Sequence, residues 1–532
     1  MHLLLPSLLL AATAHATPLA QRSQNSIKWT PCKIANASVP LECGTLTVPL
    51  DYTDKNGNAT LQIQMQRAPA EQKTKNSKSI LLNFGGPGAD GVEDMAYFAK
   101  RMQAATGGGH HLINVVPRGT GKTLPFSCYP NDILRAASSQ AIAGNSSNVA
   151  LGFAWEKSGF FAADCHAAQN KTGNLIGTAF VVRDMMQIVD ALGEDGMLRF
   201  WGVSYGTLLG STAVAMFPDK VDKVILDGVV NPFEYYENKE TELLSETDNV
   251  MKGFVKGCIS NPKACPMGKN QTAAQLEESI YQLFQKLKSE PIGIPAPGTP
   301  GGGILVDYSL ISAAIFRQLY TPFTWQNTAK CIAALMTGSN TNPNLQFCIP
   351  GMGGDSSSSG GNAKRSEAAA RQDQESQYGI KCSDVRVHTN NLTEMMPVFE
   401  GRHKKSRFFG DYADTVVARC AQWTLPAKER YMGDFNVTSK NPVLVIGNTH
   451  DPVTPLVSAK NVTETFKGSV LLQHDSYGHD SLMQASLCTA KAIRSYFVNG
   501  TLPQNGTKCD VKVPLLSGED GWDEVLKELG SS

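Results

Sequence analysis

The segment Gly202-Val203-Ser204-Tyr205-Gly206 constrains the fold of this chain more than any other part of the sequence. It lies between an apolar run, Leu198 to Trp201, and a run of small residues, Thr207 to Ala215, so it predicts a strand, a sharp turn and a helix. Glycine on both sides of the serine lets strand and helix approach closely, and such a turn directs the serine side chain outward. The same pattern also occurs in ordinary glycine-rich turns, so Ser204 needs partners elsewhere in the chain.

Short apolar runs alternate with helix-like stretches on both sides of this turn. Strands rich in valine, isoleucine and leucine that are separated by helices predict an α/β fold, with a mostly parallel sheet and helices on both of its faces. The expected strands are Thr45 to Pro49, Leu61 to Gln66, Ser79 to Phe84, Leu112 to Val116, Arg199 to Val203, Lys223 to Val230, Pro442 to Gly447 and Ser469 to Gln473. Thr178 to Leu192 and Leu208 to Phe217 are expected helices between them.

The alternation stops after Pro232 and resumes only at Pro442. We therefore expect one α/β domain, made of residues 23–232 and 402–532, with a mainly helical cap inserted at residues 233–401. The expected cap helices are Glu240 to Lys256, Ala273 to Ser289, Ser309 to Tyr320 and Thr324 to Met336. Two stretches of the cap are expected to be loops: Pro291 to Gly303, which is rich in proline and glycine, and residues 351–379, which are too polar to order themselves.

The N-terminal residues predict secretion. Residues 1–16 combine an apolar stretch, Leu3 to Ala12, with a small-x-small cleavage site at Ala14-His15-Ala16, which is the pattern of a signal peptide. Outside the cell, the twelve cysteines are expected to form disulfides rather than bind metal. The sequence leaves the connectivity open, and local spacing favours these pairs: Cys32 with Cys43, Cys128 with Cys165, Cys258 with Cys265, Cys331 with Cys348, Cys382 with Cys420, and Cys488 with Cys509.

Glycosylation sequons and charge bear on the partners of the chain. N-x-S/T sequons predict N-linked glycans and occur at Asn36, Asn58, Asn145, Asn170, Asn270, Asn391, Asn436, Asn461, Asn499 and Asn505. Lysine plus arginine equals aspartate plus glutamate, 48 of each, so no overall charge favours nucleic acid or an anionic membrane. No segment after the signal peptide has the roughly 18 uninterrupted apolar residues that predict a membrane span. We therefore expect a secreted, extracellular glycoprotein with no nucleic-acid or membrane partner.

A serine presented in this way needs a histidine and an acid at the ends of later strands. Asp451 and His479 follow the last two expected strands in that order. An imidazole with a pKa near 6.5 can accept the serine proton at neutral pH and return it, while a carboxylate fixes its tautomer. Asp227, after the strand that precedes the cap, is the alternative acid; Asp451 is favoured because it leads directly into the strand that presents His479. His450 and His474 are expected to be structural.

The same chemistry needs two backbone N–H groups that face the developing negative charge. One belongs to the residue after the serine, Tyr205. The other should come from the loop Asn83 to Gly88, which follows an earlier strand. Gly86 is the favoured donor, because glycine allows close approach and Pro87 has no N–H. An ordinary glycine-proline turn is the alternative interpretation of this loop.

Together these motifs resemble the secreted α/β-hydrolase serine peptidases of the tripeptidyl aminopeptidase group, which are related to prolyl aminopeptidases. The similarity extends from Val48 to Cys509, nearly the whole mature chain, and includes a C-terminal region typical of the group. The segments that carry it are Phe84 to Gly88, Pro117 to Gly121, Trp201 to Gly206, Leu226 to Val229, Asp451 to Pro455 and Gly478-His479. The resemblance implies the α/β-hydrolase fold and the release of tripeptides or short units from free N-termini through an acyl-enzyme.

The expected substrates are peptides with a free N-terminus, and no cofactor or metal is implied. An enzyme that selects a free amine should have carboxylates in its cap, although an acidic helix face is more often merely solvated. The candidates are Glu234, Glu237, Glu240, Glu242 and Asp248. A secreted esterase or lipase-like acyl hydrolase would use the same machinery with a different cap, and a catalytically silent binding protein on the same fold is the alternative from another class.

Overall fold

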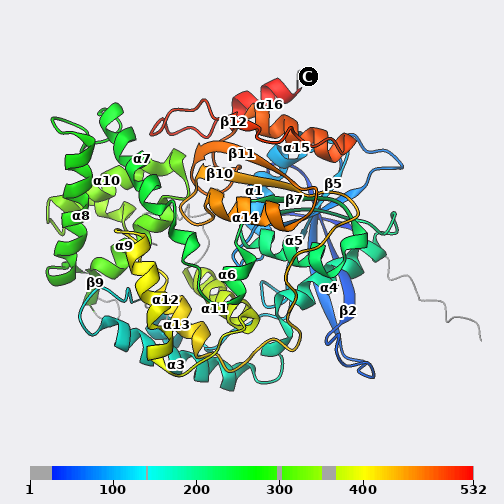
Figure 1. The fold of residues 1–532 in the computed structure, drawn as a ribbon, viewed down its shortest axis with the longest axis horizontal. Helices are drawn as coiled ribbons and strands as arrows, with labels where there is room; N and C mark the ends of the chain where they lie inside the picture. The colour runs from blue at the N-terminus through cyan, green and yellow to red at the C-terminus, as the bar shows by residue number, and fades with distance from the viewer. Residues whose placement is uncertain (1–26, 139–141, 296–301, 350–366, 531–532) are drawn as a thin grey trace, which may run out of the picture.

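The computed structural model describes residues 27–138, 142–295, 302–349 and 367–530, and Figure 1 shows their arrangement. The predicted signal peptide lies outside these ranges, as do residues 351–366 of the predicted loop. A twisted ten-stranded sheet occupies one side of the molecule, and a block of helices lies beside it (Figure 1). No helix within the described ranges is both long and apolar enough to cross a bilayer.

The sheet has the strand order β1-β2-β3-β5-β4-β6-β7-β10-β11-β12. The neighbouring pairs β1–β2, β2–β3 and β3–β5 are antiparallel, whereas all pairs from β5 to β12 are parallel. The strands are β1 (Thr30–Cys32), β2 (Leu41–Pro49), β3 (Thr60–Ala68), β4 (Ser79–Asn83), β5 (His111–Val115), β6 (Leu198–Val203), β7 (Val221–Asp227), β10 (Leu444–His450), β11 (Val470–Tyr477) and β12 (Lys508–Asp510). Every strand expected from the sequence is present. The two that were not expected, β1 and β12, have three residues each, which is too short for a pattern to emerge.

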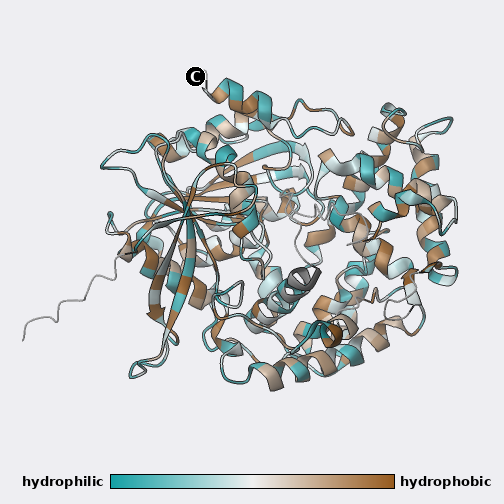
Figure 2. Ribbon diagram, turned by 180° about the vertical axis from the view of Figure 1, so that it is seen from behind, coloured by the Kyte–Doolittle hydropathy of each residue, from teal (hydrophilic) through white to brown (hydrophobic). Residues whose placement is uncertain are grey.

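Helices cover both faces of the sheet. Along β4, Leu81 faces one core while Ile80 and Leu82 face the other, because successive side chains of a strand point to opposite sides. The first face is covered by α4 (Thr178–Ala191), α5 (Tyr205–Met216) and α14 (Leu456–Thr465), and the second by α1 (Val92–Ala105), α15 (Leu487–Asn499) and α16 (Trp522–Gly530). Apolar residues accordingly recur along the strands and along the helices that pack on them (Figure 2). This arrangement is the predicted α/β-hydrolase fold.

Between β7 and β10 the chain adds no strand to the sheet in the part that the structure describes. It forms α6 (Pro232–Tyr236), α7 (Thr247–Ser260), α8 (Ala273–Ser289), α9 (Tyr308–Gln318), α10 (Trp325–Met336), α11 (Glu367–Asp384), α12 (Leu392–Lys405) and α13 (Asp414–Ala421). We call residues 232–421 the helical block, which lies to the left of and below the sheet in Figure 1. It has a core of its own, with Phe254, Phe284, Phe316 and Trp325 fully buried.

Two details of the helical block differ from the sequence-based expectation. The expected helix Glu240 to Lys256 starts only at Thr247, because Glu240 has a φ of +44° and no helix can continue through it. The expected loop Pro291 to Gly303 contributes a short antiparallel hairpin of β8 (Ile292–Pro295) and β9 (Gly303–Val306). The sequence predicted a loop here because glycine and proline are frequent in this stretch, and the apolar runs between them are too short to indicate strands.

The prediction that residues 351–379 are disordered is wrong from residue 367 onward, where α11 begins. This helix buries apolar and polar groups alike: Ile380 and Cys382 lie in the core on one face of the sheet, and Glu375 is buried in a polar cluster. The carboxylate of Glu375 accepts hydrogen bonds from the Cys128 N–H at 2.7 Å, the Ser127 hydroxyl at 3.0 Å and the Arg135 guanidinium at 2.8 Å. Low apolar content therefore did not mean absence of structure here.

Two helices from the first half of the chain, α2 (Asp132–Ser138) and α3 (Ala150–Gln169), pack on the helical block rather than on the sheet. The Arg419 guanidinium of α13 stacks 4.0 Å from the ring centroid of Phe161 in α3. The structure also contains all six disulfides preferred from the sequence, with Cα–Cα distances between 4.3 and 5.6 Å. Cys128–Cys165 and Cys382–Cys420 each tie two neighbouring segments of this region together.

Candidate active site

Ser204 lies in the turn between β6 and α5, with φ 57° and ψ −124°. Residues other than glycine rarely adopt a positive φ, and such strain is concentrated at functional sites. Two hydrogen bonds hold the turn: the Ser204 N–H donates to the Asp227 carbonyl at 3.0 Å, and the Thr207 N–H donates to the Ser204 carbonyl at 2.8 Å. The serine is therefore fixed at the carboxyl edge of the sheet.

The glycines around this turn are required by close packing. A Cβ atom on Gly206 would lie 2.4 Å from the Asn83 carbonyl oxygen, and one on Gly202 would lie 2.1 Å from the Gly206 oxygen. A Cβ on Gly85 would lie 2.7 Å from the Cβ of Ser204. The loop after β4 consequently lies directly against the serine.

His479 and Asp451 lie in the loops that follow β11 and β10, which are parallel neighbours in the sheet. His479 Nδ1 is 3.0 Å from Asp451 Oδ2 and 3.2 Å from Oδ1. The carboxylate also accepts hydrogen bonds from the Val453 N–H, the Thr454 N–H and hydroxyl, and the Asp480 N–H, at 2.7 to 3.1 Å. This many donors fix the orientation of Asp451, which in turn orients the imidazole.

The electrostatics of His479 reflect two opposing effects. Burial disfavours the protonated ring, but the charge and hydrogen bond of Asp451, together with the nearby Asp480 and Asp227, outweigh burial, so the pKa of His479 is raised above 6.5. Tyr320, just after α9, packs its ring edge-on against the imidazole with 4.8 Å between centroids. The Tyr320 carbonyl also accepts the His479 N–H at 2.9 Å, so a residue of the helical block contacts the histidine by both backbone and side chain.

Asp227, the alternative acid, has different partners from Asp451. Its buried carboxylate accepts hydrogen bonds from the Ser481 N–H at 3.0 Å, the Ser481 hydroxyl at 2.6 Å and the Trp201 indole at 3.4 Å. Burial raises the pKa of Asp227 to about 6. Because its carbonyl also holds the Ser204 N–H, Asp227 connects the serine turn to the loop that carries His479.

The other two histidines have contacts of a structural kind. His474 is buried, with Nδ1 2.8 Å from the Thr489 hydroxyl and Nε2 2.9 Å from the Gln484 carbonyl. Burial lowers the pKa of His474 to about 4, so it stays neutral. His450 stacks on Tyr477 and lies 3.1 Å from the carboxylate of Glu246.

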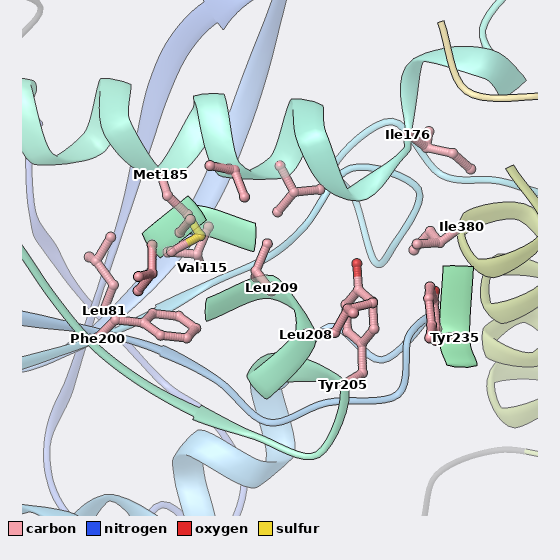
Figure 3. Close-up of a cluster of buried hydrophobic side chains, with 14 of the residues drawn as sticks. Leu81, Val115, Ile176, Met185, Phe200, Tyr205, Leu208, Leu209, Tyr235 and Ile380 are labelled. Atoms are coloured by element: carbon pink, nitrogen blue, oxygen red, sulfur yellow. The ribbon is translucent and has the colours of Figure 1, made fainter. Parts of the chain in front are cut away.

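The two expected oxyanion donors lie on either side of the serine. Gly86 belongs to the β4 loop that abuts Ser204 and has a φ of +112°, and Tyr205 begins α5. Within the described ranges, neither backbone N–H has a hydrogen-bond partner. Figure 3 shows the Tyr205 side chain turned into the core beside Leu208 and Tyr235, and its hydroxyl lies 2.6 Å from that of Thr178. Core packing thus holds the start of α5 in place, and among the described residues no acceptor takes up the Tyr205 N–H.

Comparisons with known proteins agree with this geometry. Residues 137–303 match the family model described as the α/β-hydrolase fold, and residues 406–509 match one described as TAP-like protein. The chain is 26% identical to serine protease Hip1 of Mycobacterium tuberculosis, over 91% of each chain. It is 24% identical to the tripeptidyl aminopeptidase of Streptomyces lividans, over 94% of this chain and 89% of that one. This chain has the α/β-hydrolase fold. Carboxylesterase B of M. tuberculosis is a further relative, 25% identical over 93% of this hydrolase and 92% of its own length.

The relatives of this hydrolase are serine hydrolases and peptidases, and it is an enzyme of that type.

The five carboxylates that the sequence proposes for binding the substrate amine differ in their contacts. Glu242 accepts hydrogen bonds from Ser458 and Asn461, and Asp248 accepts them from Ser406 and Arg407. These two carboxylates therefore hold segments of the fold together.

The other three candidate amine-binding carboxylates of the hydrolase have fewer contacts. Glu237 lies 3.8 Å from Arg386. Glu240 is buried and forms an ion pair with Lys381 of α11 through Oε2. Glu234 accepts the Glu242 N–H at 2.7 Å, also through Oε2. The pKa of Glu234 is raised, and burial is the largest cause.

The sequence patterns did not predict the residues that α11 contributes to the candidate active site. A Cβ on Gly88 would lie 2.4 Å from the Asp373 carbonyl oxygen and 2.6 Å from the Gln377 nitrogen, so α11 packs directly on the loop after β4. We call this loop, which carries the proposed oxyanion donor Gly86, the oxyanion loop. The same helix supplies Lys381, and Tyr320 lies just after α9. No local pattern identifies these residues, because their place depends on how helices dock on the sheet. Within the described ranges, no cluster of three His, Cys, Asp or Glu side chains could hold a metal ion.

Proposed function

We propose that this hydrolase is a secreted aminopeptidase that releases tripeptides or short N-terminal units through an acyl-enzyme on Ser204. In this mechanism His479 takes the serine proton and later gives it to the leaving amine, and Asp451 stabilises the charged imidazole. The N–H groups of Gly86 and Tyr205 stabilise the oxyanion. The observation that carries the proposal is the 3.0 Å contact of His479 with Asp451, at the sheet edge where the strained Ser204 turn also lies.

The test uses chromogenic substrates that differ in their acyl part: single aminoacyl, tripeptidyl and simple ester compounds, with free or blocked amines. We expect the free-amine peptides to give the highest kcat/KM. We expect Ser204→Ala to fold and be secreted but to lose about 10⁶ in turnover, because a triad acts as a unit. Residual activity above roughly a tenth of wild type would reject Ser204 as the nucleophile.

An esterase is the second candidate function, because one relative is named carboxylesterase B. Hydrolysis of simple esters together with failure on every peptide would favour it over the aminopeptidase. Failure on all substrates by a folded wild-type protein would favour the catalytically silent binding protein.

We further propose that Glu240 and Glu234 bind the substrate amine. Each carboxylate has a hydrogen-bond partner at Oε2 only among the described residues, so Oε1 remains available for an ammonium group. Glu240 also acts on the active site electrostatically: burial, Tyr412, Asp451 and Glu240 together raise the pKa of Tyr320, the residue that packs on His479. A charge-assisted hydrogen bond contributes roughly 1.5 to 3 kcal/mol, or about 10- to 150-fold in kcat/KM.

Glu240→Gln and Glu234→Gln should therefore lower kcat/KM for free-amine peptides by that factor, and much less for blocked ones. Glu237→Gln is the matched control, since Glu237 lies beside Arg386 instead. Glu240→Gln also leaves Lys381 buried without its partner, so the double variant with Lys381→Met separates loss of fold from loss of binding. Equal losses on free and blocked peptides in both single variants would refute the assignment.

A further inference from the structure

Arg317 lies one helical turn from the residue that contacts the proposed catalytic histidine. It is in the last turn of α9, and its carbonyl accepts the Tyr320 N–H at 3.2 Å. The Tyr320 carbonyl in turn accepts the N–H of His479, and the Tyr320 ring packs on the imidazole. Two backbone hydrogen bonds therefore connect Arg317 to His479, and its position is fixed relative to the site.

The environment of this side chain is aromatic, and it lacks an anion. The neighbouring Phe316 stacks on Tyr412 with 4.0 Å between ring centroids. The proximity of Tyr412, which has the largest effect, and of Tyr320 and Tyr378 raises the pKa of Arg317. None of the described carboxylates forms an ion pair with Arg317. The Arg317 side chain is exposed to solvent. Arg317 thus carries a permanently charged, solvent-exposed guanidinium three residues before Tyr320, the residue that contacts His479.

The side of the site on which Arg317 lies determines what it can meet. His479 gives its proton to the leaving amine, so groups next to the imidazole face the portion of the substrate that departs first. The Gly86 loop and α5, by contrast, hold the acyl portion. A guanidinium pairs with a carboxylate in a planar, bidentate geometry that suits recognition of one acidic group.

We propose that Arg317 binds a carboxylate on the leaving portion of the substrate, supplied either by an acidic side chain next to the scissile bond or by the C-terminus of a short peptide. This inference rests on the proposed function of the triad. It makes the hydrolase selective on both sides of the bond that it cleaves: for an amine on the acyl side and for an anion on the leaving side.

The experiment keeps the acyl portion constant and changes only the leaving portion. The leaving residue is Asp or Asn, and the C-terminus is a free carboxylate or an amide. Wild type should cleave the peptides with one carboxylate roughly 10- to 100-fold faster in kcat/KM than the Asn amide. Which of the two single-carboxylate peptides is preferred identifies the source of the anion. In Arg317→Gln this preference should collapse to nearly onefold, Arg317→Lys should retain part of it, and Arg317→Glu should reverse it, so that the Asn amide becomes the preferred peptide.

Arg407→Gln is the control, because Arg407 is also an exposed arginine of the helical block but pairs with Glu278. It should keep the wild-type preference. Equal cleavage of charged and neutral leaving portions by wild type, or an unchanged preference in Arg317→Gln and Arg317→Glu, would overturn the proposal. Two esters repeat the comparison without a peptide bond. In them the same acyl group is attached to the phenol oxygen of 4-hydroxybenzoate, which keeps its carboxylate, or of 4-hydroxybenzamide, which is neutral. If peptides fail and the benzoate ester is still preferred, the aminopeptidase assignment falls while the role of Arg317 stands.

Discussion

Asp451 is the most completely hydrogen-bonded residue of the proposed active site. Backbone N–H groups of three residues and the Thr454 hydroxyl converge on its two oxygens before His479 is counted. Such an anion cannot turn away from the imidazole without leaving buried donors unsatisfied, which costs about 1 to 3 kcal/mol for each group. The orientation of His479 is therefore set by the loop after β10 rather than by the serine.

The raised pKa of His479 predicts the pH dependence of the reaction. The imidazole must be neutral to accept the serine proton, so activity is lost as pH falls through its pKa. We expect the acidic limb of the kcat/KM profile, which reports the free enzyme, to have its midpoint above pH 6.5.

The variant Asp451→Asn removes the charge that raises this pKa. The midpoint should move to lower pH, and kcat should fall by about 10⁴. His450→Gln is the control, because His450 pairs with Glu246, and its limb should stay at the wild-type position. A midpoint that stays in place in Asp451→Asn would show that another group titrates.

At the level of elements, α11 connects the stability of the helical block to the active site. Its N-terminal half packs on the oxyanion loop at Gly88, and Glu375 ties it to Ser127, Cys128 and Arg135. The sequence did not predict this helix, because apolar periodicity is the main signal for a buried helix and polar residues outnumber apolar ones along α11. The strands beside it were predicted because valine, isoleucine and leucine mark them directly.

The contacts of Glu375 predict a local change in stability. Removing one partner of a buried ion pair typically costs about 3 to 5 kcal/mol, and Glu375→Gln should lie near the lower value because Arg135 retains Asp132. Amide hydrogens of residues 373–384 should then exchange roughly a hundred times faster. Glu290→Gln, at an exposed pair on α8, is the control and should leave this exchange unchanged. Unaltered exchange in Glu375→Gln would mean that the disulfide Cys382–Cys420 and apolar contacts suffice to hold α11.

For the whole molecule, the sheet order explains which site residues the sequence predicts. Ser204, Asp451 and His479 each directly follow a strand, and β7 pairs with β10, so strands on either side of the helical block become neighbours. Position after a strand can be read from the chain, and the carboxyl edge of a parallel sheet collects such residues. Tyr320, Arg317 and Lys381 come from helices whose docking depends on tertiary packing, so no pattern in the sequence predicts them.

The pairing of β7 with β10 also has a consequence for the newly made chain. A chain synthesised only as far as Gly401 has the serine turn but neither Asp451 nor His479. Leu226 of β7 pairs with Val445 of β10, and the entire helical block separates these two residues in the sequence. The sheet therefore cannot be completed until β10 has been synthesised. Contacts this distant in sequence form late, because closing so long a loop has an entropic cost that only the finished sheet repays. With Ser204, Asp451 and His479 as the proposed triad, we therefore expect a ribosome-bound chain that lacks the last strands to be inactive, and hydrolysis to begin only after those strands have been synthesised.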